Sequence, residues 1–237
     1  MANVLKVEDL ITSYKNFSVK DVNFTLKSGD VFGLIGSSGA GKSTVIKTIL
    51  GVKKADIGKV SFSVDGRDDK IAGCVGYSSQ GNALFPYLTL EENIMTFGKI
   101  YGLGKREIKT RMNLLLKLMK LENAKKKRIT ELSGGMMKRA DLIIALIHEP
   151  KVLILDEPFA GLDIALVNFL WKTIKYLAGQ GRIIIISSHS LADIKKNCTQ
   201  IGFIVDGIYY SYEQLMKKTG RTRNDPLENL FLEMGVG

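Results

Sequence analysis

The distribution of apolar and polar residues along the chain predicts a mixed α/β protein. Short, largely apolar runs at residues 31–35, 152–155 and 183–187 are typical of buried parallel strands, and residues 74–77 are a further candidate. Apolar residues at helical spacing lie between these runs. This alternation of strands and helices predicts a mostly parallel sheet with helices on its faces.

A second pattern, in which apolar and polar residues alternate, predicts an antiparallel β portion at the N-terminal side. It occurs at residues 4–10, 22–30 and 58–64. Further along, Asp206-Gly207 separates the runs GFIV and IYYS, which is a strong signal for a tight hairpin turn.

Residues from about 88 to 150 are mostly helical in pattern, and we expect them to form an inserted helical subdomain. Within residues 105–121, one helix face gathers the apolar residues Ile108, Met112, Leu115, Leu116 and Met119. The sequence contains no internal repeat and no second copy of any motif described below. We therefore expect a single domain over residues 1–237, with the helical subdomain inserted in it.

Composition narrows the class of protein. The chain has 237 residues, of which 45% are hydrophobic, as expected of a folded globular protein. None of its apolar runs approaches the ~18 residues that span a bilayer, and its polar beginning does not resemble a signal peptide. Cys74 and Cys198 lack the spacing of a metal or redox motif, so we expect ordinary buried thiols.

The stretch GSSGAGKST, residues 36–44, follows an expected strand and opens an expected helix. This spacing of glycine, lysine and serine matches the loop that cradles nucleotide phosphates. The glycines let backbone N–H groups converge on an anion, and the helix adds its positive dipole end. A glycine turn that merely contains a lysine is the alternative. The expected nucleotide contacts are Gly36, Ser37, Ser38, Gly39, Ala40, Gly41, Lys42, Ser43 and Thr44.

Within this loop two side chains have distinct expected roles. Lys42 would contact the β- and γ-phosphates, and the Ser43 hydroxyl would be a ligand of Mg²⁺. We therefore expect the chain to bind a nucleoside triphosphate.

Two carboxylates, Asp156 and Glu157, end the aliphatic strand at residues 152–155. Ligands gather at the carboxyl ends of parallel strands, so this pair is expected beside the phosphates. Asp156 would hold Mg²⁺, directly or through water, and Glu157 would activate a water molecule as general base. A solvated acidic turn is the alternative interpretation.

The two histidines have different expected roles. His189 follows the strand at residues 183–187 and could donate a hydrogen bond to a γ-phosphate, although a structural role is an open alternative. His148 stands at a helix end before Pro150, and we interpret it as exposed and without a role.

A second helix with an anion-binding N-terminus begins at Ser133-Gly134-Gly135, immediately before an apolar, helix-periodic stretch. One ATP site does not need two such loops. The simplest explanation is that this second loop serves the ATP of a partner subunit.

Taken together, these motifs resemble the ATP-binding cassette (ABC) ATPases over nearly the whole chain. In chain order the resemblance rests on the loop 36–44, Gln80 in GYSSQ, LSGGM at 132–136, LILDEP at 153–158, AGLD at 160–163 and His189. It implies a head-to-tail dimer in which each ATP lies between one subunit's phosphate loop and the other's LSGG motif.

The resemblance also implies roles for individual residues. Gln80 would sense Mg²⁺ and water and act as a metal ligand, and Asp163 would link the two sites. Tyr14 matches the aromatic residue that stacks on adenine, although it could equally be a packed strand residue. Methionine at position 136, where glutamine is common, is similar to cassettes of ABC-2-type exporters.

The partner implied by the resemblance is a separate membrane subunit, with this chain peripheral on the cytoplasmic side of the cell membrane. Residues 85–87 favour this interpretation because they place apolar side chains on a probable loop, though local packing could also explain them. The ending NDPLENLFLEMG is similar to short tails of export-type cassettes. A soluble ABC ATPase without a membrane partner is the main alternative; the LSGG motif disfavours a P-loop kinase or GTPase.

Charge is concentrated in one part of the chain. The formal net charge is +10, and residues 99–128 contain 11 lysines and arginines against two glutamates, a net +9. A solvated helix face is one interpretation, and attraction to an anionic membrane surface is another. Nucleic acid is not expected as a partner, because Tyr101 is the only aromatic residue interleaved with these charges.

Overall fold

The computed structural model describes residues 3–14 and 17–219. The chain divides into two compact units. The first contains the residues up to Gly73 and those from Lys175 onwards, and the second contains Cys74–Ile174. Each unit is described by itself, and the boundary falls inside helix α5 (Ile164–Gly179). The expectation of one domain over residues 1–237 with an inserted subdomain stays a prediction.

The first unit carries eight strands in the order β5-β4-β1-β2-β10-β9-β3-β8. Their bounds are β1 (Asn3–Tyr14), β2 (Phe17–Lys27), β3 (Val31–Ile35), β4 (Ile57–Val64), β5 (Arg67–Asp69), β8 (Ile183–Ser188), β9 (Gln200–Val205) and β10 (Ile208–Ser211). Its helices are α1 (Lys42–Ile49), α6 (Leu191–Asn197), α7 (Tyr212–Thr219) and the 3₁₀ turn η1 (Ile71–Gly73).

The N-terminal strands form the predicted antiparallel portion. β1 pairs antiparallel with both β2 and β4, and Leu5, Val7 and Leu10 point into the core from β1. β9 and β10 form the predicted hairpin, whose turn residues Asp206 and Gly207 have φ angles of 50° and 74°. Positive φ at both central residues is the requirement of a type I′ turn, which explains why Asp-Gly signals this hairpin.

β3 is the strand that positions the phosphate loop. It pairs in parallel with β8 on one side and β9 on the other, and all five of its residues are buried. Burial on both faces is the reason that this strand is a continuous apolar run. The predicted α/β fold, with parallel core strands and an antiparallel portion, is therefore confirmed.

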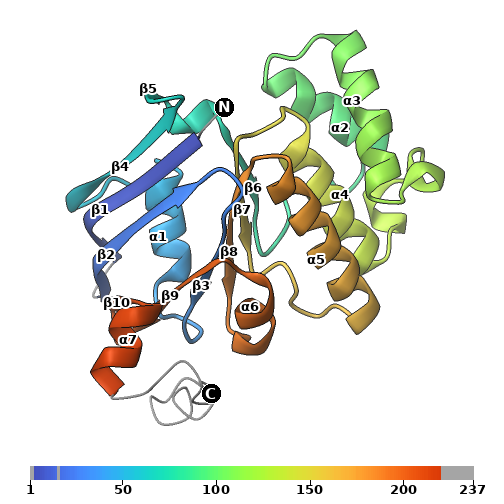
Figure 1. The fold of residues 1–237 in the computed structure, drawn as a ribbon. Helices are drawn as coiled ribbons and strands as arrows, with labels where there is room; N and C mark the ends of the chain where they lie inside the picture. The colour runs from blue at the N-terminus through green and yellow to red at the C-terminus, as the bar shows by residue number, and fades with distance from the viewer. Residues whose placement is uncertain (1–2, 15–16, 220–237) are drawn as a thin grey trace. The chain divides into compact units, whose positions relative to one another are not determined.

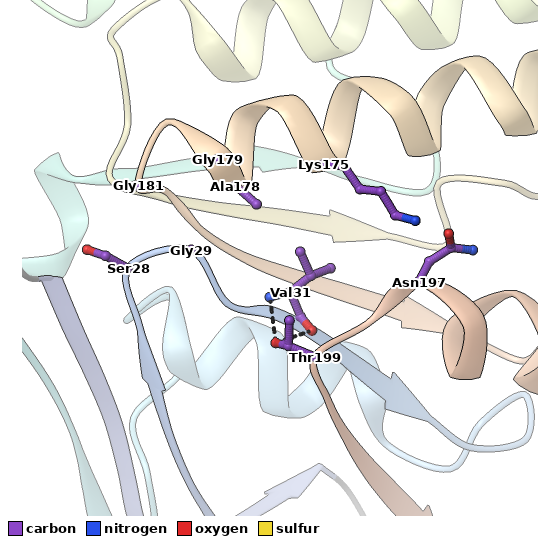
Figure 2. A pocket seen from close by; sticks show the side chains of 9 residues that line it. All are labelled: Ser28, Gly29, Val31, Lys175, Ala178, Gly179, Gly181, Asn197 and Thr199. Atoms are coloured by element: carbon purple, nitrogen blue, oxygen red, sulfur yellow. Dashed lines mark hydrogen bonds between the residues drawn. The ribbon is translucent and has the colours of Figure 1, made fainter.

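The other end of β3 is fastened by Thr199. The Val31 amide donates to Thr199 Oγ1 at 3.0 Å, and the same hydroxyl donates to the Val31 carbonyl oxygen at 3.2 Å (Figure 2). A hollow of about 490 Å³ lies here, bordered by Lys175 of α5 and Asn197 of α6 (Figure 2). Because it opens at the start of β3, it is separate from the loop that follows the strand's carboxyl end.

The second unit contains two strands and the helical segments expected from the sequence. β6 (Val75–Ser78) pairs in parallel with β7 (Val152–Asp156). Helices α2, α3 and α4 gather together in this unit (Figure 1). Their bounds are α2 (Leu90–Ile100), α3 (Lys105–Leu118) and α4 (Gly134–Leu146), with the 3₁₀ turns η2 (Glu122–Ala124) and η3 (Ile129–Glu131).

Helix α3 buries most of the face that its periodicity predicts, whereas Leu115 of that face is partly exposed. Ile108, Met112 and Leu116 are fully or almost fully buried, as is Met119 at its C-terminal cap. No helix within the described ranges is long and apolar enough to cross a membrane. Cys74 and Cys198 are both partly exposed, so the expectation of buried cysteines was wrong, although burial still raises the pKa of the Cys198 thiol to about 12. The tail NDPLENLFLEMG lies outside the described residues.

The interpretation of His148 as an exposed residue was wrong, because its ring is half-buried and packed. Its ring stacks on Tyr101 with centroids 3.8 Å apart, and its Nε2 lies 3.0 Å from the Val75 carbonyl oxygen. Since a carbonyl only accepts, Nε2 carries the proton in this hydrogen bond. The other ring nitrogen, Nδ1, is buried with no hydrogen-bond partner in the described part of the chain.

Candidate nucleotide-binding site

Between β3 and α1, the loop at residues 36–44 has the backbone that its glycines predict. Gly39 and Gly41 adopt φ angles of 82° and 103°, a region open to glycine and strained for other residues. At Gly36, a Cβ atom would come within 2.8 Å of the Ile204 carbonyl oxygen. Gly41 precedes α1 and supplies no side-chain cap, so the helix presents uncapped N–H groups to the loop. This geometry suits an anion.

Lys42 lies at the centre of the loop. Its side chain is only 6% exposed, and its Nζ donates to the carbonyl oxygens of Gly36 at 2.8 Å and Ser37 at 3.1 Å. The ammonium group is therefore held where the loop backbone converges. Ser43, the next residue, is exposed in the first turn of α1.

His189 belongs to the same unit and the same end of the strands. In the register of β3 and β8, Ile35 pairs with Ser188, so Gly36 and His189 each follow the last paired residue of neighbouring parallel strands. His189 is exposed. The position of His189 at the end of β8, next to the strand that precedes the phosphate loop, supports the prediction that His189 points toward a γ-phosphate.

Tyr14 ends β1 and pairs with Phe17 at the start of β2. It is 60% exposed, so it is not packed in the sheet. Phe17 in turn lies against Gly41, where a Cβ atom would come within 2.8 Å of the Phe17 ring. Tyr14 is thus an exposed aromatic residue whose strand partner contacts the phosphate loop, and its role as an adenine platform stays a prediction.

Within the second unit, Gln80 and the two carboxylates emerge from neighbouring strands. β6 and β7 are parallel, with Ser78 opposite Leu155. Gln80 therefore follows the carboxyl end of β6, and Asp156 and Glu157 lie at the carboxyl end of β7, on the same edge of the pair. Asp156 is buried, and its Oδ2 accepts a hydrogen bond from the Tyr77 hydroxyl at 3.3 Å. Burial and the Asp156 charge raise the pKa of Tyr77 to about 12, which keeps this donor protonated.

Ser133 is the N-cap of α4. Its Oγ accepts a hydrogen bond from the Met136 amide at 3.3 Å, and both Ser133 and Gly134 are exposed. The N-terminus of α4, which lies within the LSGG motif, is therefore exposed on the surface of this unit. Gly135 faces Leu166 of α5, whose terminal methyl group would have to move to make room for a Cβ atom at this position.

Sequence reasoning missed Asp141, a carboxylate on α4 that is only 1% exposed. It accepts hydrogen bonds from Ser78 and from the amide of Ala83, on either side of Gln80. A signal was present, since an aspartate inside the apolar run ADLIIALI must be hydrogen-bonded if it is buried.

The proposed metal ligands have a suitable chemistry. Ser43 offers a hydroxyl, Gln80 an amide carbonyl and Asp156 a carboxylate, and Mg²⁺ prefers such oxygen donors. Each of these side chains, Ser43 in the first unit and Gln80 and Asp156 in the second, thus has the donor chemistry that its predicted role toward Mg²⁺ requires.

The phosphate loop between β3 and α1, on parallel α/β strands, defines a P-loop nucleotide-binding protein. Comparison with known proteins then gives the family. Residues 19–160, more than half of the chain, match the ABC transporter family. The chain therefore belongs to the ATP-binding proteins of ABC transporters, which are ATPases.

Curated relatives agree with this assignment. The chain is 38% identical over 208 residues to the linearmycin resistance ATP-binding protein LnrL of Bacillus subtilis, covering 86% of this chain and 67% of that protein. It is 34% identical over 192 residues to the Nod factor export ATP-binding protein I of Rhizobium sp. strain N33, covering 80% and 63%. The chain thus spans about two thirds of the length of these relatives.

Solved structures give the same fold. One, an ATP-binding subunit of an ABC transporter, is 29% identical with a TM-score of 0.83 and covers 98% of this chain and 99% of its own. Another, from Clostridium perfringens, is part of the ABC transporter complex cbiONQ and is 27% identical with a TM-score of 0.76, covering 98% and 95%. The predicted fold and family are confirmed.

Proposed function

We propose that this chain hydrolyses ATP to power a separate membrane subunit, and that the complex exports its substrate. The observation that carries the proposal is the phosphate loop, where Lys42 is buried and held by the Gly36 and Ser37 carbonyls. Family membership supports ATP as the nucleotide. The names of the two curated relatives, one for Nod factor export and one for linearmycin resistance, support the direction.

In this proposal each residue has a defined task. The loop amides and Lys42 bind the phosphates, Tyr14 stacks on adenine, and Glu157 accepts a proton from the attacking water. His189 donates a hydrogen bond to the γ-phosphate. Ser43, Asp156 and Gln80 would hold Mg²⁺, which would supply positive charge next to the phosphate oxygens.

The same proposal makes the functional unit a head-to-tail dimer, of two copies or of this chain with a second cassette. Ser133 and Gly134 are exposed at the start of α4, and the positive end of a helix attracts phosphate. In the dimer this helix end contacts the ATP held by the partner's phosphate loop. Asp163, in the AGLD motif, would link the two sites.

The membrane subunit is expected to cover the segment at residues 85–87. Tyr87 is 83% exposed and Phe85 is 44% exposed, although the Phe85 ring also stacks on Phe97 at 5.5 Å. Large apolar side chains exposed on a loop mark an interaction surface. With that partner, the chain sits peripherally on the cytoplasmic side of the cell membrane. A soluble ABC ATPase is the competing function.

The proposed function is tested by comparing ATP hydrolysis by the wild type with that by Lys42→Ala. Loss of the buried ammonium should abolish turnover and weaken ATP binding strongly. Lys47→Ala is the matched control, because Lys47 is an exposed lysine on the same helix. Near-normal turnover of Lys42→Ala would contradict the proposal. Co-purification with a polytopic membrane protein would separate the transporter subunit from the soluble ATPase.

A further inference from the structure

The loop that contains Gln80, residues 79–83 (the Gln80 loop), is fastened at both ends by one carboxylate. Asp141 Oδ2 accepts from the Ser78 hydroxyl at 2.5 Å, and Asp141 Oδ1 accepts from the Ala83 amide at 3.0 Å. Ser78 is the last residue of β6, and Ala83 stands at the far side of the loop. Both oxygens of one buried side chain thus span the segment in which Gln80 lies.

A second residue of α4 reinforces this attachment. Lys138 precedes Asp141 by one helical turn, and its Nζ donates to the Ser79 carbonyl oxygen at 3.2 Å. Burial lowers the pKa of Lys138, while the charges of Asp141 and Asp156 oppose that shift. Three consecutive residues are therefore held: Tyr77 by Asp156, Ser78 by Asp141 and Ser79 by Lys138.

The buried carboxylate is costly unless it is fully hydrogen-bonded. Burial raises the pKa of Asp141, and its hydrogen bonds from Ser78 and Ala83, together with Lys138, oppose that rise. A leucine or alanine in this apolar stretch would avoid the cost. A charged group placed here is thus best explained by what it holds, which is the Gln80 loop.

We infer that Asp141 is a positioning residue that fixes the Gln80 loop to α4, so that Gln80 and the Ser133 end of that helix shift together. The inference rests on the proposed function, in which Gln80 contacts the chain's own nucleotide site and Ser133 contacts the partner's ATP. A change at one site would then reach the other through a single rigid helix of 13 residues.

A double-mutant cycle tests whether Asp141 acts through Gln80. Steady-state hydrolysis is measured for Asp141→Ala in the wild type and in a Gln80→Ala background. In the wild type we expect kcat to fall roughly 10- to 100-fold, as for other residues that orient a metal ligand, with little change in KM for ATP. In the Gln80→Ala background the further loss should disappear. An equal loss in both backgrounds would overturn the inference.

Two further variants keep the test decisive. Ser78→Ala removes one of the two hydrogen bonds and serves if Asp141→Ala fails to fold. Ser79→Ala is the matched control, because only the backbone carbonyl of Ser79 takes part in the attachment and that group is kept. We expect the kcat of Ser78→Ala to fall in the same Gln80-dependent way, and that of Ser79→Ala to be unchanged.

The link to the partner site has its own measurement. In a Glu157→Gln background, the ATP concentration that half-dimerises the protein should rise severalfold with Asp141→Ala, while one-sided nucleotide binding stays the same. An unchanged concentration would overturn the coupling. If the wild type hydrolyses no ATP, or if Gln80→Ala hydrolyses ATP as fast as the wild type, the proposed function itself is wrong. These results differ from those that would overturn only the inference on Asp141.

Discussion

Phe17 lies directly against Gly41, the N-cap residue of α1. A Cβ atom at Gly41 would come within 2.8 Å of the Phe17 ring and would also clash with Val19, and the φ angle of 103° excludes most other residues as well. The end of the β1–β2 pair is therefore packed onto the phosphate loop. Tyr14 pairs with Phe17 across these two strands.

From this arrangement we predict that Tyr14→Ala raises the KM for ATP while kcat changes little, as expected when ground state and transition state lose the same binding. Tyr14→Phe should keep the wild-type KM, because stacking needs the ring and not the hydroxyl. Steady-state kinetics over a range of ATP concentrations measure both values. An unaltered KM in Tyr14→Ala would mean that this tyrosine does not stack on adenine.

His148 should make stability depend on pH. Burial lowers its pKa, so the folded chain keeps the imidazole neutral at pH values where an unfolded histidine, with an ordinary pKa of about 6.5, takes up a proton. The unfolded state then binds more protons, and the free energy of unfolding falls as the pH drops below about 6.5 toward the lowered pKa. Protonation would also place an N–H at Nδ1, which has no acceptor within the described ranges.

The variant His148→Phe tests this contribution. It keeps a ring to stack on Tyr101 but cannot titrate. Chemical denaturation at pH 7.5 and pH 5.5 should show a smaller loss of stability for the variant than for the wild type. Equal losses would show that other groups control the pH dependence.

The error at His148 shows where sequence reasoning stops. A histidine at a helix end before a proline is ordinarily exposed, but Tyr101, which is distant in sequence, covers this ring. The same limit applies to Asp141, whose partner Ser78 lies 63 positions earlier. Local pattern predicts that a residue is buried or charged, whereas contacts between distant segments decide which partner it meets.

Strands and the phosphate loop could be predicted because their causes are local. β3 is buried on both faces and therefore consists of five consecutive apolar or glycine residues. The turn at Asp206-Gly207 needs two positive φ angles, and its two residues tolerate them. The pairing of β10 with β2, by contrast, joins segments from opposite ends of the chain, and periodicity carries no information about it.

The basic segment at residues 99–128 predicts attraction to anionic lipid. Some of its charges are already paired, such as Lys125 with Glu91 at 3.2 Å and Arg111 with Glu107 at 2.8 Å. Lys126 and Lys127 are exposed, and each would contribute about 1 kcal/mol near an anionic surface. Sedimentation with liposomes should show more binding to anionic than to neutral vesicles.

A charge-matched pair of variants locates this effect. Changing Lys126 and Lys127 to Glu should reduce binding to anionic vesicles. The same change at Lys195 and Lys196, two exposed lysines on α6, alters the net charge equally and should have a smaller effect. If the wild type binds anionic and neutral vesicles equally, the predicted attraction of the basic segment to anionic lipid is wrong.

The dimer proposal predicts a trapped state. Glu157→Gln keeps the shape of the side chain but loses the ability to accept a proton, so hydrolysis should slow by ~10²–10⁴-fold. Unhydrolysed ATP would then remain between the phosphate loop of one chain and the exposed Ser133 end of α4 in the other. The variant should elute from gel filtration as a dimer in ATP and Mg²⁺, and as a monomer in ADP.

Adding Ser133→Arg places a bulky side chain where the partner's phosphate would dock. The double variant should return to a monomer in ATP, while a fluorescent-nucleotide titration should show one-sided ATP binding nearly unchanged, because the chain's own Lys42 and Ser43 are untouched. If Glu157→Gln stays monomeric in ATP, a sandwich of two identical chains is wrong. Mixing that variant with a second cassette then decides whether the site is completed by a different partner, since only a true partner would shift it to the dimer position.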